Sequence, residues 1–240
     1  LSPAGLFGYN VVTMDSLSSP PTEPAATVEI IGHQWWWEVR YPDLGSEAVT
    51  ANEIHVPAGQ PVEIYLTSAD VIHSFWVPEL TGKIDLTPGI TTTLWLQADA
   101  PGVYRGQCAE FCGVQHTNMA LHVVAEPPDQ FAAWVQRLAQ PAPEPITADA
   151  QRGRDIFLGQ GGCIGCHTIR GTQATGIVGP DLTHLASRGW LGAGIIPNNP
   201  GTLGGWITDS QTIKPGNHMP PIPLNPADLQ ALLAYLETLQ

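Results

Sequence analysis

An alternating proline run near the middle of the chain separates two parts of different character. Residues 140–145 read Gln-Pro-Ala-Pro-Glu-Pro. This pattern favours a semi-rigid polyproline II spacer, roughly 20 Å long at about 3.1 Å per residue. The 240 residues are enough for two small domains. We therefore place the domain boundary in this run.

The part before the spacer is typical of a β domain. Short runs rich in β-branched and aromatic residues are separated by Pro-Gly turns. These runs are Thr27–Ile31, Gln34–Tyr41, Asn52–Val56, Pro61–Ser68 and Thr91–Gln97. Many short strands with such turns predict an all-β Greek-key sandwich over residues 28–126. Residues 1–27, rich in Ser, Pro and Thr, are expected to form an extended leader.

The part after residue 126 has helical periodicity. Apolar residues recur at helical spacing in 130–139, so residues 127–146 are expected to hold a short helix and the proline-rich linker. Residues 149–158 and 225–239 also read as helices. Asn225 before Pro226 is typical of an N-cap followed by proline at the first helical position. We therefore predict an all-α domain over residues 147–240.

The charge is acidic and unevenly distributed. The net charge is −13, with 14 acidic and 3 basic residues in 1–126 and 7 acidic and 5 basic residues in 144–240. A nucleic acid partner is excluded on this ground, and a basic or neutral partner is favoured for the first domain. No stretch approaches the roughly 18–20 apolar residues of a membrane helix. We expect the chain as given to be soluble.

The densest chemical segment is residues 108–119, CAEFCGVQHTNM. It places two thiols, one imidazole and one thioether within twelve residues, and His73 lies upstream beside a predicted strand. Soft sulfur ligands with imidazole and a weak Met are the pattern of electron-transfer copper sites. Two thiolates four positions apart can bridge two metal ions, which would make a binuclear site.

Two other interpretations of this segment stay open. A Cys108–Cys112 disulfide is possible, but it would leave His116 and Met119 without a purpose. A tetrahedral zinc site with His73, both cysteines and His116 is chemically acceptable, although it does not use Met119.

A second motif, Cys163-Ile164-Gly165-Cys166-His167, has the C-x-x-C-H spacing of covalent c-type haem attachment. Both thiols would bind the haem vinyl groups and His167 would ligate the iron. The alternative is a redox or zinc-binding C-x-x-C motif. A preceding amphipathic helix and two downstream segments, GPDL at 179–182 and KPGNHMP at 214–220, favour the haem interpretation.

The first domain closely resembles subunit II of haem-copper cytochrome c oxidases at its CuA centre. The resemblance covers about residues 28–125 and rests on GHQWWW at 32–37, DVIHSFWVP at 70–78, GKID at 82–85, Pro88-Gly89 and residues 108–119. It implies a cupredoxin-like fold with a binuclear copper centre. The implied ligands are Cys108 and Cys112 as bridges, His73 and His116 as terminal ligands, Met119 as a weak ligand and Glu110 through its backbone carbonyl.

The same resemblance implies two further roles. The Glu110 side chain matches a family residue that reaches a magnesium ion at the interface with oxidase subunit I. Trp35 matches the aromatic residue at which electrons enter from cytochrome c. Trp36 stands where the family usually has Tyr.

The second domain resembles class I cytochromes c over residues 147–240, with a longer Gly- and Pro-rich segment at 190–208. This resemblance implies Met219 as the sixth haem ligand, beside a proline. His218 stands directly next to it, and imidazole also binds iron. We favour Met219 because a thioether suits an apolar crevice, and we expect His218 to face solvent or the other domain.

The order of the two domains resembles caa-type oxidases, in which a cytochrome c is fused to subunit II. This implies electron transfer from a donor through haem c to CuA and on to subunit I, which reduces oxygen to water; the chain itself performs no bond chemistry. The donor would be a quinol-oxidising complex, a small cytochrome or a copper protein. Tethering the haem would give it an effective millimolar concentration at the copper.

Two other functions stay open. A CuA-type nitric oxide reductase subunit could carry similar domains, and the chain could be a free-standing soluble electron carrier. The family's two-helix membrane hairpin is absent from this sequence, so membrane association is expected only through missing helices or partner subunits. The expected location is the extracytoplasmic face of a bacterial cytoplasmic membrane.

Overall fold

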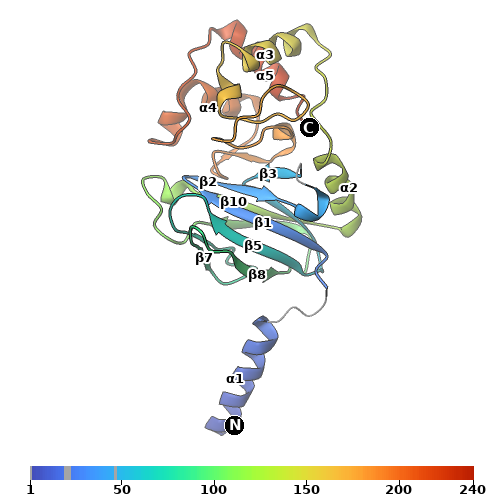
Figure 1. The fold of residues 1–240 in the computed structure, drawn as a ribbon, viewed down its shortest axis with the longest axis vertical. Helices are drawn as coiled ribbons and strands as arrows, with labels where there is room; N and C mark the ends of the chain where they lie inside the picture. Colours follow the sequence, from blue (N-terminus) through green and yellow to red (C-terminus); the bar gives the residue numbers. More distant parts are fainter. Residues whose placement is uncertain (1, 19–22, 46–47) are drawn as a thin grey trace.

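The computed structural model describes residues 2–18, 23–45 and 48–240. A β domain and a mainly helical domain are stacked on each other, and an N-terminal helix projects from the opposite end of the β domain (Figure 1). The second domain covers the end of the β domain at which β2 and β3 lie. The two candidate metal-binding segments therefore belong to two domains in contact.

Two main sheets form the cupredoxin-like β domain. The five-stranded sheet has the order β3-β2-β1-β5-β8 and the three-stranded sheet the order β4-β10-β9, with β6 and β7 as a separate pair. The strands are β1 Ala26–His33, β2 Trp36–Arg40, β3 Val49–Ala51, β4 Glu53–Pro57, β5 Val62–Ser68, β6 His73–Phe75, β7 Ile84–Leu86, β8 Thr92–Leu96, β9 Gly102–Gln107 and β10 Ala120–Glu126. Both sheets are mixed, because β1 pairs parallel with β5 and β10 pairs parallel with β4.

The core follows from the alternation of side chains along the strands. In β5 the side chains of Val62, Ile64 and Leu66 are buried, whereas Glu63 and Tyr65 between them are only partly covered. Successive side chains of a strand point to opposite faces, so this alternation directs one face of β5 into the sandwich. Large buried side chains such as Trp37 and Phe75 fill the same core next to the copper-ligand candidates.

Helix α2, Pro128–Leu138, packs against the β domain as its apolar periodicity predicts. The Trp134 ring stacks on His55 with ring centroids 4.1 Å apart and meets Tyr41 edge-on. The proline run that follows does not hold the domains apart as a free spacer. Ala142 donates its N–H to the Arg170 carbonyl over 3.0 Å, so the run lies along the second domain.

The second domain is built on three helices: α3 Ala148–Leu158, α4 Pro200–Ile213 and α5 Pro226–Leu236. Asn225 caps α5 by accepting the Asp228 N–H over 2.9 Å, with Pro226 at the first helical position, as the sequence indicates. The domain is not entirely α-helical. Trp190–Leu191 (β11) and Ile196–Pro197 (β12) form a short antiparallel pair in the Gly- and Pro-rich segment at 190–208.

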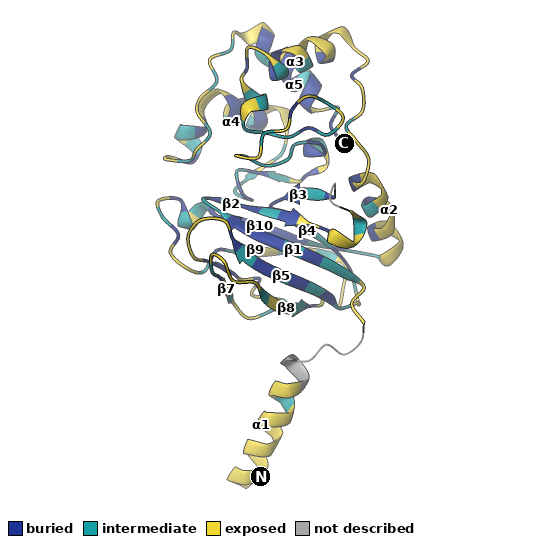
Figure 2. Cartoon of the chain, in the orientation of Figure 1, coloured by how far each residue is buried: buried dark blue, intermediate teal, exposed yellow. Residues whose placement is uncertain are grey.

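The prediction of an extended leader is wrong for residues 3–18. Pro3–Ser18 form helix α1, and the large apolar side chains described on it, including Phe7 and Val12, are exposed (Figure 2). Pro3 suits the first turn of a helix, and no further proline interrupts the chain before Pro20, so the Ser and Thr content does not prevent a helix. Residues 1 and 19–22 of the predicted leader lie outside the described residues.

Candidate functional site

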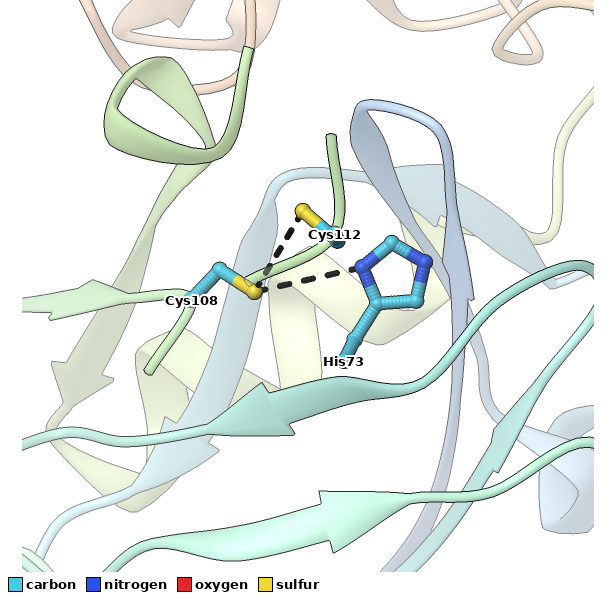
Figure 3. A group of neighbouring side chains, drawn as sticks. All are labelled: His73, Cys108 and Cys112. Atoms are coloured by element: carbon cyan, nitrogen blue, oxygen red, sulfur yellow. Dashed lines mark hydrogen bonds between the residues drawn. The ribbon is translucent and has the colours of Figure 1, made fainter. Parts of the chain in front are cut away.

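Two buried thiols lie side by side at one end of the β domain. Cys108 and Cys112 lie in the loop that follows β9, with their Sγ atoms 3.8 Å apart (Figure 3). His73 opens β6 and directs Nδ1 to 3.9 Å from Cys108 Sγ. A disulfide requires about 2.05 Å between its sulfur atoms, and both thiols are free. These three residues form a group that could hold a metal ion.

The other predicted copper residues complete the cluster. His116, which begins the short helix η2 (His116–Asn118), places Nδ1 3.7 Å from Cys112 Sγ. Met119 is fully buried, with Sδ 3.8 Å from the same sulfur. The Glu110 carbonyl oxygen lies 3.3 Å from Cys108 Sγ. The structure thus brings all six predicted residues together, with one histidine beside each cysteine.

Asp70 orients His73 and was missed by the sequence analysis. Its carboxylate accepts from His73 Nε2 over 2.8 Å and from the Gln34 and Val71 N–H groups over 2.6 Å each. A histidine that donates through one ring nitrogen presents the other as a ligand, so this contact directs the Nδ1 lone pair at Cys108. The signal in the sequence is a carboxylate three residues before the histidine.

The two thiols cannot both ionise easily without a cation. The hydrogen bond between the two thiols lowers the pKa of Cys108 well below its usual range and raises the pKa of Cys112. Two adjacent thiolates repel each other, so the doubly ionised pair needs positive charge between its members. Soft thiolate, imidazole and thioether donors together fit copper, and the buried Met119 sulfur is a donor that a zinc site would not use.

One cavity brings together the four predicted haem residues. Cys163, Cys166, His167 and Met219 line it together with Trp35 and other residues of the β domain. The cysteines come from the turn η3 (Cys163–Gly165) and its end, and Met219 comes from the loop after α4. Both thiols are free. These residues fit a haem bound covalently by two thiols and held between an imidazole and a thioether.

The His167 ring is fixed in the form that binds a metal. Its Nδ1 donates to the Pro180 carbonyl over 2.7 Å, which leaves Nε2 as the ligand atom. Burial lowers the pKa of His167 and so favours the neutral imidazole. A side chain at Gly179 would lie 2.6 Å from His167 Cε1, so only glycine lets this loop approach the ring. The GPDL motif thus has a physical role in positioning the histidine.

Trp35 lies between the two clusters. It is buried, and its indole Nε1–H donates to the Cys112 carbonyl over 3.0 Å. The Gln34 side chain donates to the same oxygen over 2.8 Å. On the other side, Trp35 lines the haem cavity and its ring centroid lies 5.2 Å from that of His218. We expected His218 to face either solvent or the other domain. It does both, because it is exposed and its ring contacts Trp35.

A buried lysine, which no local pattern in the sequence indicates, joins the domains. Lys214 Nζ donates to the Trp35 carbonyl over 2.8 Å and to the Gly192 carbonyl over 3.0 Å. Burial lowers the pKa of Lys214 to about 7. Further contacts across the interface are the hydrogen bond from Gln115 to the Pro215 carbonyl, that from the Trp190 N–H to Glu53 and the stacking of His122 on Trp190.

The remaining histidines are structural. His33 bonds Glu38 over 2.9 Å and His55 bonds Glu126 over 3.0 Å. His184 does not line the haem cavity. It is buried, and its two ring nitrogens lie at 2.8 Å from the Gln240 carbonyl and 3.1 Å from the Gln140 carbonyl. It therefore ties the linker to the C-terminus.

Comparison with known proteins finds relatives of both domains. Residues 47–126 match the family described as cytochrome c oxidase subunit II, periplasmic domain, and residues 150–240 match cytochrome c. A relative from Alkalihalophilus pseudofirmus, named cytochrome c oxidase subunit 2, is 41% identical over 89% of this chain and 61% of its own length. The chain is thus similar to cytochrome c oxidase subunit II in its cupredoxin-like first domain and to cytochrome c in its second.

Other relatives agree. The subunit 2 of Bacillus sp. strain PS3 is 36% identical over 89% of this chain and 62% of its own length. The chain thus spans about three fifths of the length of these curated relatives. The solved periplasmic domain of subunit II of the Bradyrhizobium japonicum cytochrome oxidase is 32% identical over 48% of this chain and 94% of its own, with a TM-score of 0.46. Among the described residues, none of the helices is both long and apolar enough to cross a membrane.

Proposed function

We propose that this chain carries electrons from a covalently bound haem c in its second domain to a binuclear copper centre in its first, and from there to subunit I of a cytochrome c oxidase that reduces oxygen to water. One observation carries the proposal: two complete donor sets form in separate domains, and Trp35 contacts both the copper loop at Cys112 and the haem cavity. When bound, the iron and the copper pair each accept and release one electron at a time.

For the copper centre, we propose that Cys108 and Cys112 bridge two ions. His73 and His116 are the terminal ligands, Met119 is a weak ligand and the Glu110 carbonyl completes the set. Each histidine Nδ1 approaches a different thiol, which supports one imidazole for each ion. The Asp70 contact and the burial of both cysteines hold these atoms in place without solvent, so little rearrangement accompanies the arrival of an electron.

For the haem, we propose that Cys163 and Cys166 form the thioether bonds and that His167 and Met219 are the axial ligands. The Met219 N–H donates to Asn217 Oδ1 over 2.7 Å, and its carbonyl accepts from Ser210 Oγ over 2.6 Å. These bonds fix the backbone on both sides of the thioether. His/Met ligation raises the potential of a haem, which suits a one-electron carrier.

We infer the partners and the location from the similarity to subunit II. We propose that the two domains lie on the outer face of a bacterial cytoplasmic membrane, against oxidase subunit I, and receive electrons from a quinol-oxidising complex or a small redox protein. The strand order is compatible with a Greek-key cupredoxin. The relatives named cytochrome c oxidase favour an oxidase over a nitric oxide reductase. The Glu110 side chain is exposed and outside the metal-binding group, so magnesium is not included in the proposal.

Electron paramagnetic resonance tests the copper assignment. One unpaired electron shared equally by two copper nuclei gives a seven-line hyperfine pattern, whereas one copper ion gives four lines. The oxidised protein is expected to show seven lines, and four lines would reject the bridged centre. The haem assignment is tested by denaturing the protein in acid and organic solvent: haem held by two thioethers stays with the polypeptide, and haem that separates would reject it.

A further inference from the structure

The contact between the domains converges on one residue, Trp35. Its side chain, backbone and neighbours are held from three directions: Nε1 bonds the Cys112 carbonyl, the carbonyl accepts from Lys214, and the ring faces His218 at 5.2 Å. The ring planes of Trp35 and His218 are inclined by 56°. This arrangement connects the residue beside Met219 to the peptide group of a copper-ligand candidate.

We propose that His218 is the bridge through which electrons pass from the haem site to Trp35, and that Lys214 is the positioning residue that keeps the two rings in contact. This inference rests on the proposed function and names the path within it. One electron leaves the reduced haem site and one arrives at the oxidised copper pair. No bond forms or breaks at His218 or Trp35, and neither side chain retains the electron.

The haem side of this bridge is held by the loop after α4. His218 precedes Met219, and both line the cavity that also contains Cys163 and Cys166. The hydrogen bonds from Met219 to Asn217 and from Ser210 to Met219 fix the backbone that carries both side chains. With the Met219 thioether in the cavity, the neighbouring imidazole is left at the wall formed by Trp35.

The copper side of the bridge is equally constrained. Gln34 and Trp35 both donate to the Cys112 carbonyl, which ties the indole to the backbone of the copper loop. A Cβ atom at Gly113 would lie 2.9 Å from Trp35 Cζ2, and Gly113 has a φ of +120°. Glycine at this position therefore lets the loop lie directly against the ring. The path from His218 to Cys112 contains one ring contact and one hydrogen bond.

Lys214 is suited to hold the two halves of the path together. Its side chain is 3% exposed and stands at the C-terminal end of α4, four residues before His218. Its ammonium group bonds one carbonyl from each domain, at Trp35 and Gly192. A buried charged group needs such partners. Removal of the lysine side chain would in turn leave both carbonyls unpaired. Removing the ammonium group should thus loosen the interface at Trp35.

The test compares variants of the full chain, loaded with haem and copper, by following copper reduction after rapid reduction of the haem. His218→Ala is expected to slow the transfer about tenfold, which corresponds to about 1.4 kcal/mol of activation free energy. His218→Phe restores a ring and should recover most of the rate. Lys214→Met should also slow it. All three should keep the near-infrared band of Met–iron ligation and the copper resonance, which shows that both sites are intact.

A second readout tests the contact itself without electron transfer. In the copper-free, haem-reduced protein, His218→Ala should shift the indole N–H resonance of Trp35 in the proton NMR spectrum, because a ring 5.2 Å away is removed. An unchanged resonance would overturn the contact. A transfer rate in His218→Ala equal to that of the parent protein would overturn the bridge alone, and an unchanged rate in Lys214→Met would overturn its positioning role. Absence of internal transfer in the parent protein would overturn the proposed function as well.

Discussion

Helices α3 and α5 cross in such close contact that a side chain added between them should lower the stability of the domain. Gly153 of α3 lies directly against α5. A Cβ atom at this position would stand 2.0 Å from the Ala231 carbonyl oxygen and 2.7 Å from Tyr235 Cβ, well short of the 3.4 Å at which ordinary contact begins. The first obstacle is a backbone oxygen within a helix, which cannot rotate away. Gly153→Ala must therefore move the two helices apart.

Two opposing effects determine how much Gly153→Ala changes the free energy of unfolding. Alanine in place of glycine favours a helix interior by about 1 kcal/mol. Overpacking of a tight contact typically costs about 1–3 kcal/mol, and more where backbone must shift. We expect a net loss of about 2 kcal/mol in the free energy of unfolding. For a domain of this size, that lowers the melting temperature by roughly 10 °C.

Gly205 provides a matched control. It lies in helix α4, is exposed and has nothing within 4 Å of an added Cβ atom. Gly205→Ala gains the same helix propensity without a clash, so its melting temperature should equal or exceed that of the parent protein. Melting is followed by far-ultraviolet circular dichroism at equal haem content, because a bound group stabilises the folded state. A Gly153→Ala protein that melts at or above the parent temperature would refute the packing argument.

Three further predictions concern the two sites and the partly buried His55 of the β domain. Cys112→Ser should abolish the shared-electron copper signal, whereas Met119→Leu should change the copper potential more than the copper content; retention of seven lines in Cys112→Ser would contradict the bridge. Met219→Ala should remove the near-infrared band and lower the haem potential, and a band that persists would reassign the sixth ligand. Burial lowers the pKa of His55, but Glu126 and Glu53 outweigh it and raise the pKa above 6.5. Its stabilising contribution is therefore complete below pH 6.5 and is lost as the pH rises through the folded-state pKa. The difference in melting temperature between the parent protein and His55→Gln should shrink from pH 6 to pH 9. A difference that stays constant would contradict the raised pKa of His55.

The sequence predicted those parts of the fold that local patterns determine. Alternating burial in β5 follows directly from residues 62–66, and the cap of α5 follows from Asn225 and Pro226. Most copper-ligand candidates lie in one twelve-residue segment and three of the haem residues in one motif. Because these donors are close in sequence, a short loop or turn is enough to bring them together.

Features that depend on distant residues could not be predicted in this way. Lys214 and Trp35 are 179 positions apart, and nothing near Lys214 indicates that it is buried. Composition alone also failed at the N-terminus, where Ser and Thr content suggested an extended chain and α1 formed instead. His184 belongs to the same group, because its two partners come from the linker and the C-terminal residue.

We propose that electrons pass within one chain from its haem site to its copper site. Internal transfer is tested by reducing the haem with a short light pulse and recording copper reduction at several protein concentrations. The two domains are already in contact through Trp35, Lys214 and His218. We therefore expect a rate constant for copper reduction that is the same at every protein concentration. A rate that rises in proportion to protein concentration would mean that electrons move between separate molecules and would contradict the account.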